Sequence, residues 1–433
     1  MGFFTGLEQL KAATAPGAFH NSRERRDPPK CHPHTREAIL QKIIDWVEKK
    51  INTDPFILWL WGAAGAGKSA IAQTITELCH EQKLLLGSFF FSRNAPLQCS
   101  SERLFASIAY RMIQSILAIR GLILSAIEDD LVFEKSLESQ FLALIAHPLS
   151  SLLEAGTNGL ETFPPLIIID GLDECMDDTR REIIDVLVRV TKRCELPLIF
   201  LVTSRPEQDI VLAMDSVKVD LARIPLDTEY WSNNDIEYYL CDKISEIRNT
   251  HPLRSTLPPS WPSDDDIQTL VFKSSGQFIY ISTAVKYFSS SRHRPTWRLD
   301  VILGVIPPGP SDLPFAQLDA LYRFIVNSTE NPRLTARILT AVIFFSYQLP
   351  EVVDYVLSLE LGDSRLLLSD LGAVVSMTER GADTQVKILH ASLGDFLDDP
   401  ARAGALYMNP GLIRADISRK LLHFIQQPKL CGE

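Results

Sequence analysis

The chain has 433 residues, of which 46% are hydrophobic, 22% charged and 9% aromatic. These values are typical of a soluble globular protein, and the length suits two or three domains with their own apolar cores. The 43 Lys and Arg residues are outnumbered by 54 Asp and Glu residues, which gives a net charge of -11. This balance excludes a broadly basic surface, so we expect no general binding to nucleic acid or to anionic membranes.

The cysteines and the apolar segments indicate the compartment. The seven cysteines are scattered and form no CxxC pair, which favours reduced thiols in an intracellular protein. The N-terminus lacks the basic and apolar regions of a signal peptide, and no apolar run is long enough to span a membrane. The sequence therefore predicts a cytoplasmic protein without a membrane span.

The first elements follow a polar beginning. Residues 1–36 are polar and interrupted by proline, so we expect a short, partly ordered lead-in. From Thr35 onward, apolar residues recur at helical spacing and predict a helix. Four later apolar runs have the length and the flanks of fully buried strands. They are residues 56–61, 84–91, 166–169 and 198–202.

Helical patterns lie between these runs. They follow the first strand, extend from Glu102 to about Leu153, and recur around Ile183 and Val190. Because buried strands alternate with helices, we predict an α/β fold with a parallel sheet that is covered on both faces. From about Trp231 onward strand signals become rare and helices dominate, and the proline-rich stretches 252–262 and 307–314 indicate subdomain boundaries.

A phosphate-binding loop is the strongest motif. Residues 62–69 match GxxxxGK[ST] at every fixed position. The glycines let successive N–H groups point at phosphate oxygens, and the helix predicted directly afterwards adds its positive end. Lys68 is expected to reach the β- and γ-phosphates, and the Ser69 hydroxyl to ligate Mg²⁺. The predicted nucleotide-binding residues of this segment are Gly62, Ala63, Ala64, Gly65, Ala66, Gly67, Lys68, Ser69 and Ala70.

A cluster of acids follows the third predicted strand. Asp170, Asp173 and Glu174 come directly after the run 166–169. An acid at the carboxyl end of a strand beside a P-loop can hold Mg²⁺ through its water shell, so Asp170 is predicted as the second metal ligand. Acidic turns after strands are also common without any function, but the P-loop upstream favours the functional interpretation.

Three other sites carry weaker signals. Arg205 ends the fourth predicted strand and could contact a γ-phosphate or an acid, although arginines there often form only surface ion pairs. His390 lies among apolar residues, where a histidine is usually a hydrogen-bonded part of the core. The segment 31–34 reads Cys-His-Pro-His but has no second cluster at zinc spacing, so we predict no metal there.

The segments GAAGAGKS, LIIIDGLDE and LIFLVTSRPE together resemble the NACHT class of signal-transducing P-loop ATPases. The resemblance is closest to fungal proteins built like the heterokaryon-incompatibility and NOD-like receptors, and the small residue after Asp170 is part of its most discriminating feature. Residues 28–36 resemble the segment that encloses the base in these chains. Residues 274–280 resemble their helical-domain signature, and residues 319–322 and 389–397 resemble their winged-helix region.

The resemblance implies roles for the matching residues. Asp173 and Glu174 would polarise the attacking water, and Arg205 would be the first sensor. Thr35 and Arg36, in the segment before the P-loop, would help to enclose the base. His390 would contact the β-phosphate of bound ADP and lock the closed state. The nucleotide would be ATP or GTP, with ATP preferred, together with Mg²⁺; the base pocket itself has no pattern that distinguishes the two.

We therefore predict a three-layer α/β P-loop NTPase with a parallel sheet, followed by helical and winged-helix-like domains. The expected order is a lead-in at 1–36, the NACHT P-loop domain at 37–225, a helical domain at 226–310, a winged-helix-like domain at 311–405 and a helical tail at 406–433. Members of this class usually add an effector domain before the NTPase and a repeat array after it. We find neither pattern, so we expect either a minimal or truncated member or one whose ligand-sensing part is supplied elsewhere.

The predicted function is a nucleotide-dependent signalling switch in fungal NOD-like receptor signalling or non-self recognition. It would bind a nucleoside triphosphate with Mg²⁺, hydrolyse it slowly and self-associate when open, with a protein partner that the sequence does not identify. One alternative is a catalytic P-loop enzyme such as a small-molecule kinase. The presence of both Asp173 and Glu174 argues against it, and so does the long helical C-terminal half. The other is a scaffold that has lost nucleotide binding, against which the intact motifs argue.

Overall fold

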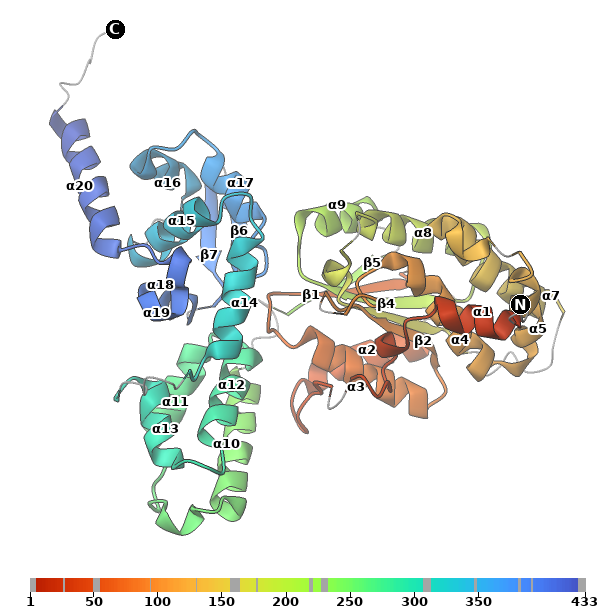
Figure 1. Cartoon of the computed structure of the whole chain (residues 1–433), viewed down its shortest axis with the longest axis horizontal. Helices are drawn as coiled ribbons and strands as arrows, with labels where there is room; N and C mark the ends of the chain where they lie inside the picture. The colour runs from red at the N-terminus through yellow and green to blue at the C-terminus, as the bar shows by residue number, and fades with distance from the viewer. Residues whose placement is uncertain are drawn as a thin grey trace, which may run out of the picture. The chain divides into compact units, whose positions relative to one another are not determined.

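The chain folds into two compact units. The first comprises Met1–Gly62 and Gly67–Tyr230, and the second comprises Ala63–Ala66 and Trp231–Glu433. The computed structural model of the chain (Figure 1) describes residues 5–25, 28–49, 55–93, 95–129, 131–155, 164–176, 178–217, 221–226, 233–306, 313–345, 349–380, 383–390 and 392–426.

A five-stranded parallel sheet forms the centre of the first unit. Its spatial order is β2-β3-β4-β1-β5. The strands are β1 (Ile57–Trp61), β2 (Leu85–Phe90), β3 (Leu166–Asp170), β4 (Ile199–Ser204) and β5 (Leu221–Pro225). The first four agree with the predicted buried runs, and every residue of β2, β3 and β4 is buried. The sequence did not predict β5, whose mixed polar and apolar residues are mostly only half-buried, as is usual at a sheet edge.

Helices cover both faces of this sheet, as predicted. Figure 1 shows α2 and α3 on one side and α8 and α9 on the other, and α3 contacts β2, β3 and β4. The helices of the unit are α1 (Gly6–Ala13), α2 (Glu37–Lys49), α3 (Lys68–Glu81), α4 (Leu104–Ser115), α5 (Arg120–Ala126), α6 (Leu137–Phe141), α7 (His147–Glu154), α8 (Arg180–Arg193) and α9 (Gln208–Ser216). This three-layer arrangement buries β2, β3 and β4 completely.

The start of the chain is more ordered than the predicted lead-in. Helix α1 packs against α4 and α5, and Leu10 has no exposed surface. Ala15 and Ala18 are also fully buried in the core of the unit. The polar composition of residues 1–36 misled the prediction, because a few apolar side chains are enough to fix a short segment onto an existing core.

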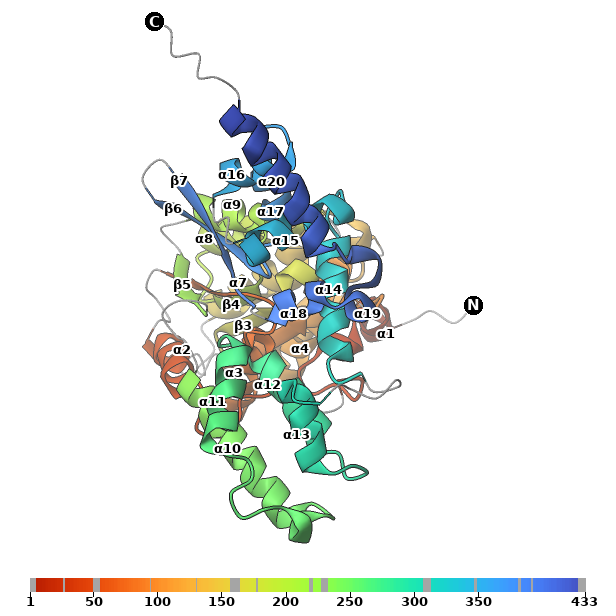
Figure 2. The same ribbon diagram turned by 90° about the vertical axis from the view of Figure 1, so that its left-hand side faces the viewer.

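The second unit is mostly helical, as predicted (Figure 2). Within its described residues the strands are the antiparallel pair β6 (Val375–Arg380) and β7 (Asp383–Ile388). The helices are α10 (Asn233–Thr250), α11 (Asp264–Ser274), α12 (Phe278–Phe288), α13 (Pro295–Leu303), α14 (Ala316–Asn327), α15 (Pro332–Phe345), α16 (Pro350–Leu357), α17 (Asp363–Ser369), α18 (Ser392–Asp398), α19 (Pro400–Ala403) and α20 (Pro410–Gln426).

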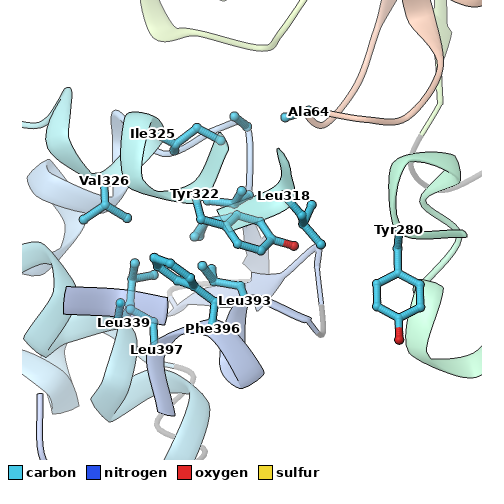
Figure 3. Close-up of a cluster of buried hydrophobic side chains, with 14 of the residues drawn as sticks. Ala64, Tyr280, Leu318, Tyr322, Ile325, Val326, Leu339, Leu393, Phe396 and Leu397 are labelled. Carbon is cyan, nitrogen blue, oxygen red and sulfur yellow. The ribbon is translucent and has the colours of Figure 1, made fainter. Parts of the chain in front are cut away.

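One apolar core extends through this second unit. It includes Ile236 on α10, Tyr280 on α12, Tyr322 on α14 and Phe396 on α18. The rings of Tyr322 and Phe396 pack with their centroids 5.5 Å apart (Figure 3). The predicted boundary between a helical and a winged-helix-like domain, at residues 310 and 311, lies outside the described residues.

Two general properties of the described residues bear on function. No helix among them is long and apolar enough to cross a membrane. Among these described residues, no group of three or more His, Cys, Asp or Glu side chains is arranged to hold a metal ion.

Candidate nucleotide-binding site

The predicted P-loop connects β1 to α3. Gly65 and Gly67 have φ values of 76° and 98°, a conformation that side chains other than glycine rarely adopt. Helix α3 begins at Lys68, directly after Gly67, so its first turn presents free N–H groups at the loop. The strand–loop–helix context that the motif requires is therefore present.

The remaining loop residues are all small and enclosed. Ala63, Ala64 and Ala66 are buried. By its contacts this tip of the loop belongs to the second unit, where the Ala64 N–H donates to the carbonyl of Ala373 (2.9 Å). Ala70 lies in the first turn of α3, and its carbonyl accepts a hydrogen bond from the Thr74 hydroxyl (2.9 Å).

Lys68 lies against its own loop. Its Nζ donates to the carbonyl oxygen of Gly62 at 2.7 Å, and only 9% of the residue is exposed. Burial lowers the pKa of Lys68 to about 8, although Asp173, Asp170 and Glu174 all favour the charged form. An ammonium group at the first residue of the helix after the P-loop is placed to donate charge-assisted hydrogen bonds to a phosphate.

Asp170 connects the end of β3 to two neighbouring elements. Its Oδ1 accepts from the Thr203 hydroxyl on β4 (2.6 Å), and its carboxylate also accepts from the hydroxyl of Ser69 on α3. Burial raises the pKa of Asp170, and these two hydrogen bonds oppose that rise. The hydroxyl of Ser69 and the carboxylate of Asp170 are hard oxygen donors of the kind that Mg²⁺ prefers, so this pair fits a magnesium site.

Asp173 lies between two arginines. The backbone N–H of Arg205 donates to its Oδ1 (2.9 Å), and the Nε of Arg205 lies 3.1 Å from Oδ2. A guanidinium nitrogen of Arg93 lies 3.5 Å from the same Oδ2. The Asp173 carboxylate is therefore the shared partner of two ion pairs, and the side chains of Asp173, Arg205 and Arg93 are all largely buried.

Glu174 has a different environment. It accepts a hydrogen bond from the backbone N–H of Arg93 at 3.2 Å. Burial, and then the negative charge of Asp173, raises the pKa of Glu174. A carboxyl group with a raised pKa is better suited to exchange a proton with water than one fixed in ion pairs.

The sequence did not predict Arg93 as a site residue. It follows β2, the strand next to β3, so the parallel sheet brings its side chain to the carboxyl ends of the strands. It also pairs with Glu207 at 3.1 Å, and Glu207 pairs in turn with Arg180. The signal that could have found it is an arginine shortly after the end of a buried strand, which is also the place of Arg205.

Thr35 and Arg36 lie directly before α2. Both are buried, and the Thr35 hydroxyl donates to the carbonyl of His32 (2.7 Å). Arg36 has a φ of 59°, which is uncommon for a residue with a side chain. The backbone N–H of Cys31 donates to Thr74 on α3 (3.0 Å), so this segment lies along the helix that follows the P-loop.

His390 lies in the core of the second unit. It is 2% exposed, and its Nδ1 is 3.2 Å from the hydroxyl of Tyr322. The Tyr322 hydroxyl is also 2.7 Å from the Ser392 hydroxyl. The three polar groups form a small buried network, which is the setting expected of a hydrogen-bonded core histidine as well as of a buried ligand.

Comparison with known families supports the assignment of the first unit. Residues 34–205 match the family described as Nephrocystin 3, N-terminal, which is a NACHT-like P-loop NTPase family. The matched segment includes the P-loop, the acids from Asp170 to Glu174 and Arg205, and it ends before Trp231, where the main part of the second unit begins. No curated protein sequence matches this chain significantly.

Solved structures show the fold. The Walker-type ATPase PABY2304 of Pyrococcus abyssi is 14% identical to this chain with a TM-score of 0.52, and the similarity covers 85% of this chain and 98% of that one. The two proteins therefore share a fold, the P-loop NTPase fold with a helical C-terminal region.

Two further structures are more distant. Cdc6p from Pyrobaculum aerophilum is 12% identical, with a TM-score of 0.39 over 92% of this chain and 96% of that one. The Drosophila ORC bound to DNA is also 12% identical, with a TM-score of 0.38 over 87% and 96% of the two chains. Similarity at this level supports no statement about nucleic acid for this protein.

Proposed function

We propose that this protein is a nucleotide-dependent switch of the NACHT type, which binds ATP with Mg²⁺ and hydrolyses it slowly. The observation that carries the proposal is the hydrogen bond between the Ser69 hydroxyl and the Asp170 carboxylate. It joins the P-loop helix to the end of β3 and brings together the two groups that would hold Mg²⁺. Lys68, one residue before Ser69, would bind the β- and γ-phosphates.

Each acid would have its own task in this site. Ser69 and Asp170 would hold the metal ion, which neutralises phosphate charge when bound. Glu174, with its raised pKa, would orient the attacking water, with Asp173 beside it. Arg205 would respond to the γ-phosphate through its contact with Asp173.

Slow hydrolysis is expected from this arrangement. The Asp173 carboxylate is engaged by Arg205 and Arg93, and an acid that is paired in this way is a weak base, so of the two acids only Glu174 would activate water. A switch uses the triphosphate and diphosphate forms to favour different conformations, and hydrolysis only resets it. We infer that the open form self-associates and that ADP, with His390 contacting its β-phosphate, favours the closed form.

The direct test is to purify the chain, release its bound nucleotide by denaturation and identify it by chromatography. ADP or ATP at near-stoichiometric occupancy is expected, and steady-state turnover well below one per second. A guanine nucleotide would change the assignment of the base. Turnover of many per second with a small-molecule phosphate acceptor would instead identify a kinase, and complete absence of nucleotide together with no binding of added ATP would contradict the proposal.

A further inference from the structure

The segment before α2 is built into the nucleotide-binding unit. The N–H of Ala15 donates to the Ser107 hydroxyl (2.9 Å), and the Nδ1 of His20 is 3.1 Å from the hydroxyl of Ser88 on β2. Most of this segment precedes residue 34, where the family match begins. Its contacts fix it along α3 and β2, the two elements that border the predicted magnesium ligands.

Arg25 is the residue of this segment that points to the site. Its guanidinium carbon lies 3.8 Å from the centroid of the Phe90 ring, and its Nη2 donates to the Oε1 of Gln73 (3.2 Å). Gln73 has no exposed surface and donates in turn to the carbonyl of His20 (3.1 Å). An aromatic ring on one side and a buried amide on the other hold the guanidinium in one place.

That place is next to the magnesium ligands. Phe90 is the last residue of β2 and is the register partner of Asp170 on β3. Gln73 is four residues after Ser69 on α3, which is one helical turn. The two contacts of Arg25 are therefore made with the register partner of Asp170 and with a residue one helical turn from Ser69, the two predicted magnesium ligands.

Arg25 acts on the acids by its charge and not by direct contact. No carboxylate of the described residues forms an ion pair with it, and its Nε is buried without a hydrogen-bond partner among them. Burial lowers the pKa of Arg25, while Asp170 and Glu174 are the two groups that oppose this effect. Asp173, in contrast, already has its own counter-charges in Arg205 and Arg93.

We propose that Arg25 is a fixed cation of the nucleotide site, which compensates the charge of Asp170 and Glu174 and sets the Mg²⁺ concentration at which nucleotide binds. The proposal rests on the proposed function, because it concerns the same metal position. A positive charge close to a cation site repels the divalent ion and lowers its affinity. Arg25 is a positioning residue in this sense, since its side chain is held by Phe90 and Gln73 and would act on the site through its charge.

The test measures the Mg²⁺ concentration that gives half-maximal binding of a fluorescent ADP analogue. In Arg25→Gln, which removes the charge, this concentration should fall by about three- to tenfold relative to wild type, as expected for the loss of one nearby unit charge in a partly buried site. Arg25→Lys keeps the charge and should stay within about twofold. Arg23→Gln is the matched control, because Arg23 is exposed in the same segment and the net charge changes equally.

Several outcomes separate the proposal from a structural role. If Arg25→Gln has the Mg²⁺ dependence of wild type, or shifts it no more than Arg23→Gln does, the proposal is wrong, even if the melting temperature falls. If Arg25→Gln does not fold, Phe90→Leu is measured in its place. Loss of the Phe90 ring should release the Arg25 guanidinium and lower the Mg²⁺ concentration for half-maximal binding, as Arg25→Gln would. An unchanged Mg²⁺ dependence in Phe90→Leu overturns the proposal.

A second measurement keeps this inference distinct from the proposed function. Binding of Mn²⁺, as a paramagnetic substitute for Mg²⁺, is measured on the nucleotide-free chain. If wild type binds no nucleotide, the proposed function fails, while tighter Mn²⁺ binding in Arg25→Gln would still support the role of Arg25. If wild type binds nucleotide and both cation measurements are unaffected by Arg25→Gln, only the inference about Arg25 fails.

Discussion

Asp173 and Arg205 are joined at two points across the ends of β3 and β4. The backbone N–H and the Nε of Arg205 lie 2.9 Å and 3.1 Å from the two carboxylate oxygens of Asp173. The side chain of Arg205 is 13% exposed and that of Asp173 is 3% exposed, so water screens this ion pair little. Glu174 is the next residue in the chain. Among the described residues, its carboxylate accepts a hydrogen bond only from the backbone N–H of Arg93. The two neighbouring acids should therefore respond differently to substitution.

We expect Glu174→Gln to slow hydrolysis strongly and to leave nucleotide affinity and stability nearly unchanged, because the amide can still accept the Arg93 N–H but cannot take a proton. Asp173→Asn should also reduce the free energy of unfolding by roughly 2–3 kcal/mol, because the buried guanidinium of Arg205 loses its counter-charge and that of Arg93 keeps only Glu207. Nucleotide affinity, single-turnover hydrolysis and urea unfolding measured on both variants test this difference.

The control for Asp173→Asn is Asp209→Asn, because Asp209 also pairs with an arginine of this region but is half exposed. It should change stability by no more than about 0.5 kcal/mol. Equal effects of Asp173→Asn and Glu174→Gln on stability and on hydrolysis would contradict the separate roles assigned to the two acids.

Lys68→Ala should abolish tight nucleotide binding while the fold is kept. The ammonium group is largely buried and not on a solvent-facing surface, and burial already lowers its pKa to about 8. Its removal takes away the charge that would contact phosphate, and the loss of its hydrogen bond to the buried Gly62 carbonyl should lower the free energy of unfolding by about 1–3 kcal/mol. Nucleotide content after purification and a thermal melt give the two readouts, with Lys42→Ala, an exposed lysine on α2, as the control. Full nucleotide occupancy in Lys68→Ala would show that the P-loop assignment is wrong.

The sequence predicted the central sheet and the P-loop well, because both depend on local patterns. The four apolar runs have the length and the flanks of buried strands, and Gly65 and Gly67 are required by backbone geometry. It missed β5 and α1, whose side chains are only partly apolar and which are stabilised by the core already present. Arg93 and Arg25 were missed for another reason. Their importance depends on which strands and helices are neighbours in space, and the strand order β2-β3-β4-β1-β5 cannot be derived from any short segment of the sequence.

His20 should make the stability of the first unit dependent on pH. Burial, together with the positive charges of Arg111 and His80, lowers the pKa of His20 to about 4, whereas an unfolded histidine titrates near 6.5. Between these values the unfolded chain binds a proton that the folded chain does not, so stability is full above about pH 6.5 and is lost as the pH falls toward 4. The total loss should be no more than about 3 kcal/mol.

The measurement is urea unfolding at pH 7 and pH 5 for wild type and for His20→Asn, whose amide can still bond the Ser88 hydroxyl. The decrease in the free energy of unfolding should be about 2 kcal/mol larger in wild type than in the variant. Equal decreases would mean that other groups cause the acid sensitivity and that His20 binds its proton equally well in the folded and the unfolded chain.

His390→Ala tests the proposed closed state. If the imidazole contacts the β-phosphate of ADP, the lost bond is to a charged group and is worth about 1.5–3 kcal/mol. At roughly 2 kcal/mol, ADP release should be about thirtyfold faster, and spontaneous self-association should follow because the open form becomes more populated. Tyr322→Phe is the matched control, since it removes the hydroxyl that lies 3.2 Å from Nδ1 and keeps the imidazole. It should lower the melting temperature and leave ADP release almost unchanged. If His390→Ala behaves in the same way as Tyr322→Phe, with a lower melting temperature and unchanged release, His390 is a core residue of the second unit and has no part in the switch.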